Sequence, residues 1–343
     1  MVTAEELPGG LVYIRDNQPG YTRKKYGKGF RYLDKKEEKL SNESELSRIK
    51  SLVIPPAWKN VWISPKKTSY LQATGVDDKG RKQYLYHEKW SEYASKLKFQ
   101  DLLDFGFYLP TLRARYKKDL NQKSWNRSKV LALATALLDE LYLRVGNKLY
   151  TETNHSHGLT TLRRKHLVED GKNIRLNFIG KSGKERSVEL TNKKLVNLLK
   201  NCSALPGYEL FRYQEAGEWR TLDSSSINEY ISAQADEDKY FTAKYFRTWG
   251  ANSLCIKNKL EAKNLCKDTR KNPSTALIKL VAENMGHTQA VCKSSYLHPD
   301  IVVHCLSEVE LKDCLPSDFD EKKYKPEEAE LMKILCTKIE QML

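Results

Sequence analysis

Five side chains in this sequence have the chemistry needed to break and rejoin a phosphodiester: Arg144, Lys181, Arg247, His287 and Tyr296. A tyrosine can attack phosphorus directly, and two guanidinium groups can hold the non-bridging oxygens through paired hydrogen bonds. An imidazole can add a third donor, and an ammonium can protonate the departing alkoxide. Tyr296 follows His287 by nine residues. The set predicts metal-free transfer of a DNA strand to tyrosine.

A buried helix is expected to position Arg144. Apolar residues recur three and four apart from Val130 to Tyr142, which is the period of one helix face. Asn126 or Ser128 is the expected cap, and Gly146 is the expected stop. This pattern places Arg144 at the end of a rigid, buried element.

Lys181 is expected at the tip of a β-hairpin. Between His157 and Leu190 the helical period lapses into three short β-type runs separated by the turns Glu-Asp-Gly-Lys and Gly-Lys-Ser-Gly-Lys, which predicts a three-stranded antiparallel meander. A long cation on the second turn can reach into a neighbouring groove. A lysine in a turn is also commonly just a solvated surface residue, and taken alone Lys181 favours that interpretation.

Composition and pattern predict an α+β protein of two domains. The first ninety residues are rich in Gly, Pro and Tyr and contain the β-type runs Leu11–Ile14, Val61–Ile63 and Gln83–Tyr86. Helical spacing begins near Trp90. We therefore expect a small, mainly β domain over 1–88 and a larger, mainly helical catalytic domain over 89–343 that contains the three-stranded region. Further helices are expected at 193–199, 226–235, 242–256, 274–285 and 327–342.

The net charge favours a polyanionic partner. The chain carries +15, with a pI near 9.3. Residues 306–343 hold ten acidic and six basic side chains, a net charge of −4, so residues 1–305 carry +19. The last helix has an acidic face opposite Leu331, Ile334, Leu335, Ile339 and Met342, which predicts a packing or partner element and a poor DNA contact.

Other functional classes receive little support. The seven cysteines form no C-x-x-C pair, which indicates reduced, mostly buried thiols. His155 and His157 lack partners at metal-site spacing, and Gly180-Lys181-Ser182 lacks the first glycine of a phosphate loop, so we predict no metal and no cofactor. No run of eighteen apolar residues and no signal peptide are present, so we expect a soluble intracellular protein.

Six ordered segments resemble the small type IB DNA topoisomerases of the poxviral and bacterial group. The resemblance runs through most of the chain, and its segments are Gln72–Gly75 with Gly80–His87, Leu143–Asn147, Gly158–His166 (similar to the family's strand), Phe178–Lys181, Phe241–Gly250, and Gly286–Pro299. The sequence departs from the family pattern at His155–His157, at the Ala251–Asn252 step and in the acidic tail.

The resemblance implies a fold, a mechanism and a partner. The family fold is a small β domain and a helical catalytic domain closing as a C-shaped clamp around double-stranded DNA, which implies a monomer associated with DNA. It also implies that Tyr296 forms a 3′-phosphotyrosyl ester, that Arg144, Arg247 and His287 stabilise the transition state, and that relaxation of supercoils requires neither ATP nor metal. Lys181 is the expected general acid.

The resemblance further implies DNA contacts in the β domain. Arg81, Gln83, Tyr84 and Tyr86 surround a predicted turn and strand, and their planar or amide groups can meet base edges and backbone. An ordinary sheet surface with exposed tyrosines is the alternative. Two further lysines beside these segments complete the predicted DNA-binding set, namely Lys82 and Lys244.

Two other functions remain open at this point. A site-specific tyrosine recombinase shares the Arg, Lys, Arg, His and Tyr plan, but Lys244 stands where recombinases usually carry histidine, and the N-terminal region has no helical core-binding pattern. A non-enzymatic DNA-architectural protein could use the same charge and aromatic residues. It would have no reason to place a tyrosine nine residues after Gly-His.

Overall fold

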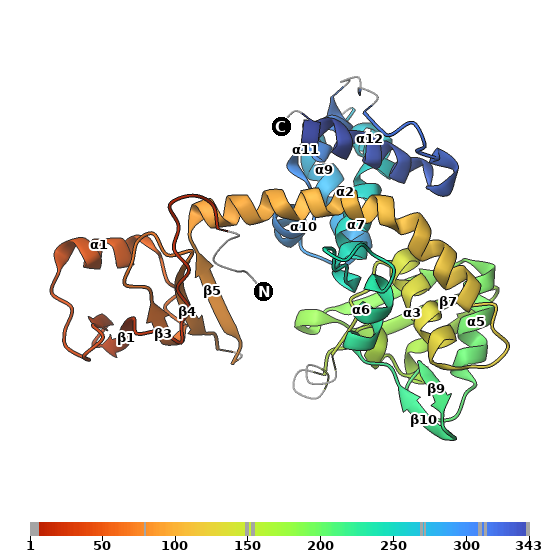
Figure 1. Cartoon of the computed structure of the whole chain (residues 1–343), viewed down its shortest axis with the longest axis horizontal. Helices are drawn as coiled ribbons and strands as arrows, with labels where there is room; N and C mark the ends of the chain where they lie inside the picture. The colour runs from red at the N-terminus through yellow and green to blue at the C-terminus, as the bar shows by residue number, and fades with distance from the viewer. Residues whose placement is uncertain are drawn as a thin grey trace. The chain divides into compact units, whose positions relative to one another are not determined.

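The computed structural model describes residues 7–78, 80–147, 151, 155–267, 270, 272–307, 311 and 314–340. The chain divides into two compact units, Met1–Lys98 and Phe99–Leu343, and the long helix α2 (Glu88–Asp119) runs through the boundary (Figure 1). Lys79 in the predicted Asp-Lys-Gly turn and Met342 in the last helix lie outside the described residues, as does the side chain of Ile339.

The N-terminal unit contains one antiparallel sheet of five strands in the order β2-β1-β3-β4-β5. Its elements are β1 (Tyr21–Tyr26), β2 (Gly29–Leu33), α1 (Glu43–Ser51), β3 (Lys59–Ile63), β4 (Leu71–Val76) and β5 (Lys82–Tyr86). The Asn42 side chain caps α1 by accepting from the Glu45 backbone N–H. Ile49 of α1 packs with Val61, Ile63 and Ala73 on one face of the sheet.

The opposite face of this sheet has its own apolar cluster. Trp62, Tyr70 and Leu71 pack there with Trp90 at the start of α2. The run Leu11–Ile14, predicted as a strand, makes only one bridge, between Val12 and Ser69. That prediction is wrong because the apolar side chains of the run cover this cluster, leaving the backbone outside the sheet.

The second unit is mainly helical with two small sheets (Figure 1). Its helices are α3 (Arg127–Leu141), α5 (Lys193–Ser203), α6 (Ser224–Ser232), α7 (Ala243–Lys257), α8 (Lys259–Cys266), α9 (Pro273–Met285), α10 (Gln289–Ser295), α11 (Pro299–Leu306) and α12 (Pro326–Glu340). Its strands are β6 (Leu167–Asp170), β7 (Asn173–Ile179), β8 (Glu185–Leu190), β9 (Arg212–Glu215) and β10 (Glu218–Thr221). Short turns of 3-10 helix lie at Leu159–Thr161, Arg164–His166, Lys181–Gly183 and Glu321–Lys323.

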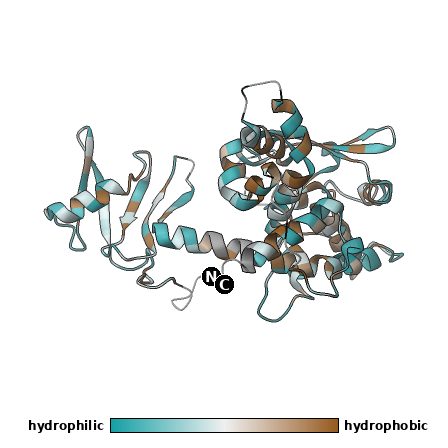
Figure 2. Cartoon of the chain, turned by 90° about the horizontal axis from the view of Figure 1, so that it is seen from above, coloured by the Kyte–Doolittle hydropathy of each residue, from teal (hydrophilic) through white to brown (hydrophobic). Residues whose placement is uncertain are grey.

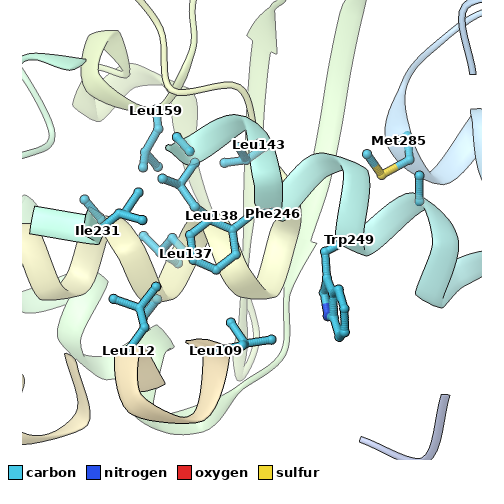
Figure 3. Close-up of a cluster of buried hydrophobic side chains, with 14 of the residues drawn as sticks. Leu109, Leu112, Leu137, Leu138, Leu143, Leu159, Ile231, Phe246, Trp249 and Met285 are labelled. Atoms are coloured by element: carbon cyan, nitrogen blue, oxygen red, sulfur yellow. The ribbon is translucent and has the colours of Figure 1, made fainter. Parts of the chain in front are cut away.

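The core of the second unit forms where α2, α3 and α7 meet. Leu109, Leu137 and Phe246 from these three helices are fully buried together (Figure 3). In Figure 2 the helices of this unit alternate hydrophobic and hydrophilic stretches, as expected of amphipathic helices. Because α7 also carries Arg247, this core holds a predicted site residue on a rigid, buried helix.

The fold class is confirmed, as are the three-stranded meander β6-β7-β8 and helices at each predicted position. Two details differ. The helix before Arg144 ends at Leu141, because Tyr142 adopts the left-handed conformation that Gly146 was expected to supply.

The second difference concerns residues 158–166, which resembled a strand. This segment forms 3-10 turns, and β6 begins only at Leu167. Its first backbone N–H groups instead bond outside any sheet, from Leu159 to the Arg144 carbonyl and from Thr160 to the Val145 carbonyl, each at 2.8 Å. These two bonds hold the backbone of Arg144 and Val145 in place.

The last helix is tied to the core by a buried acid. Arg113 makes paired hydrogen bonds to both Asp139 of α3 and Glu328 of α12. Glu328 also accepts from the Trp249 indole at 3.1 Å. Burial alone would raise the pKa of Glu328, but the hydrogen bonds and charge of Arg113 lower this pKa overall. One acidic residue of α12, Glu328, therefore lies inside the protein in an ion pair with Arg113. The spacing of polar and apolar residues in the sequence did not predict this pair.

None of the helices among the described residues is long and apolar enough to cross a lipid bilayer.

Candidate active site

Tyr296 lies at the end of a short helix that the local sequence defines at both ends. Gly286 ends α9 in the left-handed conformation (φ 63°), and the Thr288 side chain caps α10 by accepting from the Val291 N–H. Tyr296 follows the last residue of α10, and its backbone N–H donates to the Cys292 carbonyl at 3.1 Å. His287 and Tyr296 thus bracket one helix of two turns.

The rings of His287 and Tyr296 are stacked, with centroids 4.4 Å apart and planes inclined by 19°. Burial, followed by the charges of Arg247, Arg144 and Arg186, lowers the pKa of His287 to about 3. His287 is therefore neutral at physiological pH and offers one N–H donor. Its buried Nδ1 has no hydrogen-bond partner among the described residues.

Arg247 joins this pair from α7. It is 4% exposed, and it donates to the carbonyls of Tyr142 and Met285 and contacts Nε2 of His287. Its guanidinium carbon lies 5.4 Å from the centroid of the Tyr296 ring. Burial and then the neighbouring Arg144 lower the pKa of Arg247 to about 10, which leaves it charged at neutral pH.

The cations around Tyr296 favour its phenolate. Burial alone would raise the pKa of Tyr296, but Arg247, Arg144 and Lys244 lower it overall. Lys244 is exposed near the start of α7, and Arg144 is half-buried in the extended segment after α3. A phenol next to guanidinium groups can attack phosphorus while those groups stabilise charge on phosphoryl oxygens. Four of the five predicted residues therefore come together here.

Lys181 is the predicted residue that stands apart. It lies in the turn between β7 and β8, where Ser182 and Gly183 both have positive φ. Its side chain is exposed and forms no hydrogen bond or ion pair with other described residues. The predicted hairpin position is correct, and proton delivery from it stays a prediction.

The same hairpin contributes Arg186, which the sequence analysis missed. Its guanidinium lies against Gly286, where a Cβ atom would collide with it, and Nη2 donates to the Asn284 carbonyl at 3.4 Å. Burial and then Arg144 lower the pKa of Arg186. Arg186 therefore docks the lysine hairpin beside His287. No local sequence signal separates it from the other cations of this segment.

Asn252 is a second missed residue, and it holds the segment from Tyr296 to His298. Its amide Nδ2 donates to the Tyr296 carbonyl at 2.9 Å, and its Oδ1 accepts from the His298 N–H at 2.9 Å. Asn252 is fully buried one turn after Thr248, to whose carbonyl it also donates. A polar residue within the buried stretch of a helix was the available signal.

We expect Asn252→Ala to slow single-turnover cleavage by up to about 10²-fold, because the Tyr296 backbone loses its anchor and small misplacements of reacting groups are costly. It should also lower the free energy of unfolding by about 1–3 kcal/mol, since two buried polar groups lose their partner. Ser253→Ala is the matched control, because the buried Ser253 hydroxyl has no hydrogen-bond partner among the described residues. Destabilisation of Asn252→Ala with unchanged cleavage would limit Asn252 to a structural role.

The predicted base-contacting residues cluster within the N-terminal unit. Asp77 accepts from Arg81 Nε at 2.8 Å and from Gln83 Nε2 at 2.9 Å. Lys82 pairs with Asp16 at 2.6 Å. Tyr84 and Tyr86 stack in parallel on the exposed strand β5, with centroids 6.0 Å apart. Acidic side chains therefore orient the polar members of this set.

His155 and His157, which were considered as metal ligands, have other surroundings in the structure. His157 Nδ1 lies 2.8 Å from the Thr161 carbonyl, and the His157 ring contacts His166 edge to face. His155, His157 and His166 line a cavity of about 880 Å³ that is also lined by Arg163, Lys165 and Arg186. Among the described residues, no group of His, Cys, Asp or Glu is suited to hold a metal ion.

Comparison with known proteins identifies the family. The model of the eukaryotic DNA topoisomerase I catalytic core matches residues 87–312, and the model of the bacterial DNA topoisomerase IB N-terminal domain matches residues 29–77. The DNA topoisomerase 1B of Acanthamoeba polyphaga mimivirus is 36% identical over 291 residues, covering 81% of this chain and 85% of the relative. The DNA topoisomerase 1B of vaccinia virus strain Copenhagen is 24% identical over 240 residues, covering 66% of this chain and 70% of the relative.

The chain belongs to the type IB DNA topoisomerases, of the small viral and bacterial type. Its activity is that of a type IB DNA topoisomerase, and its substrate is DNA. A crystal structure of the XerH site-specific recombinase bound to palindromic difH substrate is also similar, at 15% identity and a TM-score of 0.35, covering 68% of this chain and 59% of that chain.

Proposed function

We propose that Tyr296 is the nucleophile that cleaves one strand of duplex DNA. The phenol gives up its proton to solvent, and Oη attacks the scissile phosphorus in line. The bond from phosphorus to the 5′-oxygen breaks, leaving a 3′-phosphotyrosyl ester and a free 5′-hydroxyl. The observation that carries this proposal is the contact of Tyr296 with His287 and Arg247, within a group of cations that lowers its pKa.

Arg144, Arg247 and His287 stabilise the transition state. The two guanidinium groups bind the non-bridging oxygens of the pentacoordinate phosphorus, and neutral His287 adds one hydrogen bond. Lys181 donates a proton to the leaving 5′-oxygen and regains one from solvent. Positive charge supplied by the protein takes the place that a metal ion holds in many phosphoryl-transfer sites.

Rejoining reverses these steps without ATP. The phosphotyrosyl ester has nearly the energy of the bond that was broken, so the 5′-hydroxyl can attack it directly. Between the two steps, torsion in supercoiled DNA turns the free end.

Plasmid relaxation in EDTA without ATP tests the proposal. We expect catalytic relaxation that passes through a protein–DNA adduct trapped by denaturant. Relaxation that depends on a divalent metal or on ATP would overturn it. Recombination at defined sites would favour a tyrosine recombinase, and a stoichiometric mobility shift alone would favour an architectural protein.

The two parts of the chain divide the work in this proposal. Residues 1–88 form a DNA-contacting domain and residues 89–343 form the catalytic domain, acting as a monomer clamped around the duplex inside the cell. The following side chains contact the DNA: Arg81, Lys82, Gln83, Tyr84, Tyr86 and Lys244. Support comes from the exposed stacked tyrosines of β5 and from the exposed cation of Lys244.

We expect Gln83→Ala to change the distribution of cleavage sites on a duplex of mixed sequence. An amide can donate to and accept from one base edge, and Asp77 holds the amide of Gln83 in one orientation. Sequencing of covalent adducts measures the distribution. Lys59→Ala, at an exposed position on β3 of the same sheet, should leave it unchanged. Weaker binding with the original distribution would reduce Gln83 to a phosphate contact.

Sulfur substitution tests Lys181 as the proton donor. A thiolate leaves without protonation, because the pKa of a thiol is near about 8.5. A bridging 5′-sulfur at the scissile phosphate should therefore restore cleavage by Lys181→Ala. It should restore cleavage by Arg247→Ala far less, since that defect lies in charge stabilisation. Equal rescue of both variants, or rescue of neither, would remove Lys181 from the role of acid.

A further inference from the structure

The hairpin formed by β1 and β2 carries positive charge that the fold does not explain. Residues 21–33 contain five Lys and Arg and no Asp or Glu. One of these cations is structural, since Arg23 is buried and donates to the carbonyls of Ile54, Pro55 and Trp58. Lys24 is largely exposed and reaches only Glu37, at 4.0 Å and also exposed, which is a weak pair.

Strand register places part of this hairpin on the sheet face that bears Lys82, Tyr84 and Tyr86, three of the predicted DNA contacts. Gln83 alternates with them and lies on the other face of β5. Residues paired across antiparallel strands share a face, and the pairs Thr22↔Trp62, Trp62↔Thr74 and Thr74↔Tyr84 connect β1 to β5. Successive side chains on a strand alternate between faces. Lys24 and Tyr26 of β1, and Arg31 opposite Lys24 on β2, therefore lie on the face that bears Lys82, Tyr84 and Tyr86.

Turns next to the two edge strands of the sheet lie at the same end of the sheet. The turn between β1 and β2 and the turn between β4 and β5 follow the same end of the antiparallel sheet, given its order and registers. Figure 1 shows β1 and β5 on opposite sides of β3 and β4. Strands lie about 4.8 Å apart, so β1 and β5 are separated by about 14 Å. This spacing is similar to the major groove width of about 12 Å.

The outer edge of the hairpin is built around an exposed aromatic ring. Tyr26 is 63% exposed, and the Arg31 guanidinium carbon lies 3.9 Å from the centroid of its ring. This cation–π contact orients Arg31 without neutralising its charge. Among the described residues, no carboxylate lies within ion-pairing distance of Arg31.

We propose that Lys24 and Arg31, the latter oriented by Tyr26, bind the phosphate backbone of duplex DNA on the side of a groove opposite the strand contacted by Lys82, Tyr84 and Tyr86 of β5. The proposal rests on the DNA contacts assigned to Lys82, Tyr84 and Tyr86 under the proposed function, and it adds a second contact surface at the other edge of the same sheet face. The partner is identified by charge: exposed cations spaced across a groove fit a polyanion, and Arg31 can bind a phosphate with paired hydrogen bonds.

The salt dependence of DNA binding tests this proposal without requiring cleavage. In a Tyr296→Phe background, the dissociation constant is measured for a duplex from low to physiological salt. Each phosphate contact contributes about 0.9 to the slope of log affinity against log salt. Lys24→Ala with Arg31→Ala should therefore flatten the slope by about 1.8, equivalent to about a tenfold smaller loss of affinity over a fourfold rise in salt.

The matched control removes the same charge elsewhere. Lys35→Ala with Lys36→Ala alters two exposed lysines in the turn after β2, at the other end of the sheet, and should change the slope little. Tyr26→Ala should weaken binding less than Arg31→Ala, because the Tyr26 ring orients the Arg31 guanidinium and does not itself contact the phosphate. Thermal melting of each variant checks folding.

An unchanged slope for the hairpin pair, or an equal change for the control pair, would overturn the proposal. Because binding is measured without cleavage, this failure is distinct from failure of the proposed mechanism, which would appear as loss of relaxation by the wild-type enzyme. Preferential loss of single-stranded binding in Tyr26→Ala would also overturn it, in favour of base stacking.

Discussion

We expect Tyr296→Phe to abolish relaxation of supercoiled DNA and covalent trapping of the protein on DNA, because in the proposed mechanism the substitution removes the atom that forms the phosphotyrosyl ester. The ring that stacks on His287 remains, so folding and DNA binding should persist. Denaturing gels that detect a protein–DNA adduct measure the first result, and mobility shifts measure the second. The expected loss exceeds that of any other single substitution.

Two other tyrosines provide the control for this prediction. The Tyr245 hydroxyl donates to Asp101 and the Tyr230 hydroxyl to Asp119, and burial raises the pKa of both. A buried phenol with a raised pKa stays protonated at neutral pH and is a poor nucleophile. Tyr245→Phe and Tyr230→Phe should therefore retain adduct formation. An adduct that persists in Tyr296→Phe and disappears in one of these variants would reassign the nucleophile.

Arg247→Ala should slow cleavage and religation together by roughly 10²-fold or more, the scale for losing one donor to a developing charge. Both directions share one transition state, so both rates fall by a similar factor. Single-turnover cleavage and religation of a trapped adduct measure them. Arg144→Ala should behave in the same way. His287→Ala should cost similarly or less, because neutral imidazole donates one hydrogen bond where guanidinium donates two.

Controls separate chemistry from folding and from binding. Arg247 also donates to the carbonyls of Tyr142 and Met285, so the melting temperature of each variant is measured alongside its rates. Arg220→Ala removes an exposed arginine paired with Glu215 and should leave both rates unchanged. Normal single-turnover cleavage with weaker DNA affinity in Arg247→Ala would make Arg247 a binding residue.

The amino-acid sequence alone predicted which side chains belong to the candidate site and which local elements carry them. Helix period and a cap at Asn126 or Ser128 predicted α3, where the structure uses Asn126, and two turns rich in glycine and lysine predicted the meander that carries Lys181. Such signals are readable because capping, turn chemistry and periodicity depend on neighbours within a few residues. The exception near Tyr142 was a left-handed non-glycine residue, for which sequence gives a poor signal.

Only the tertiary structure brought α7, α9 and α10 together so that Arg247 contacts His287 and lies beside Tyr296. The anchoring of Tyr296 by Asn252, the docking of Arg186 on Gly286 and the burial of Glu328 against Arg113 likewise join residues far apart in the chain. The neutrality of His287 follows from burial among cations. Desolvation and charge proximity are properties of packing, so no local pattern in the sequence encodes them.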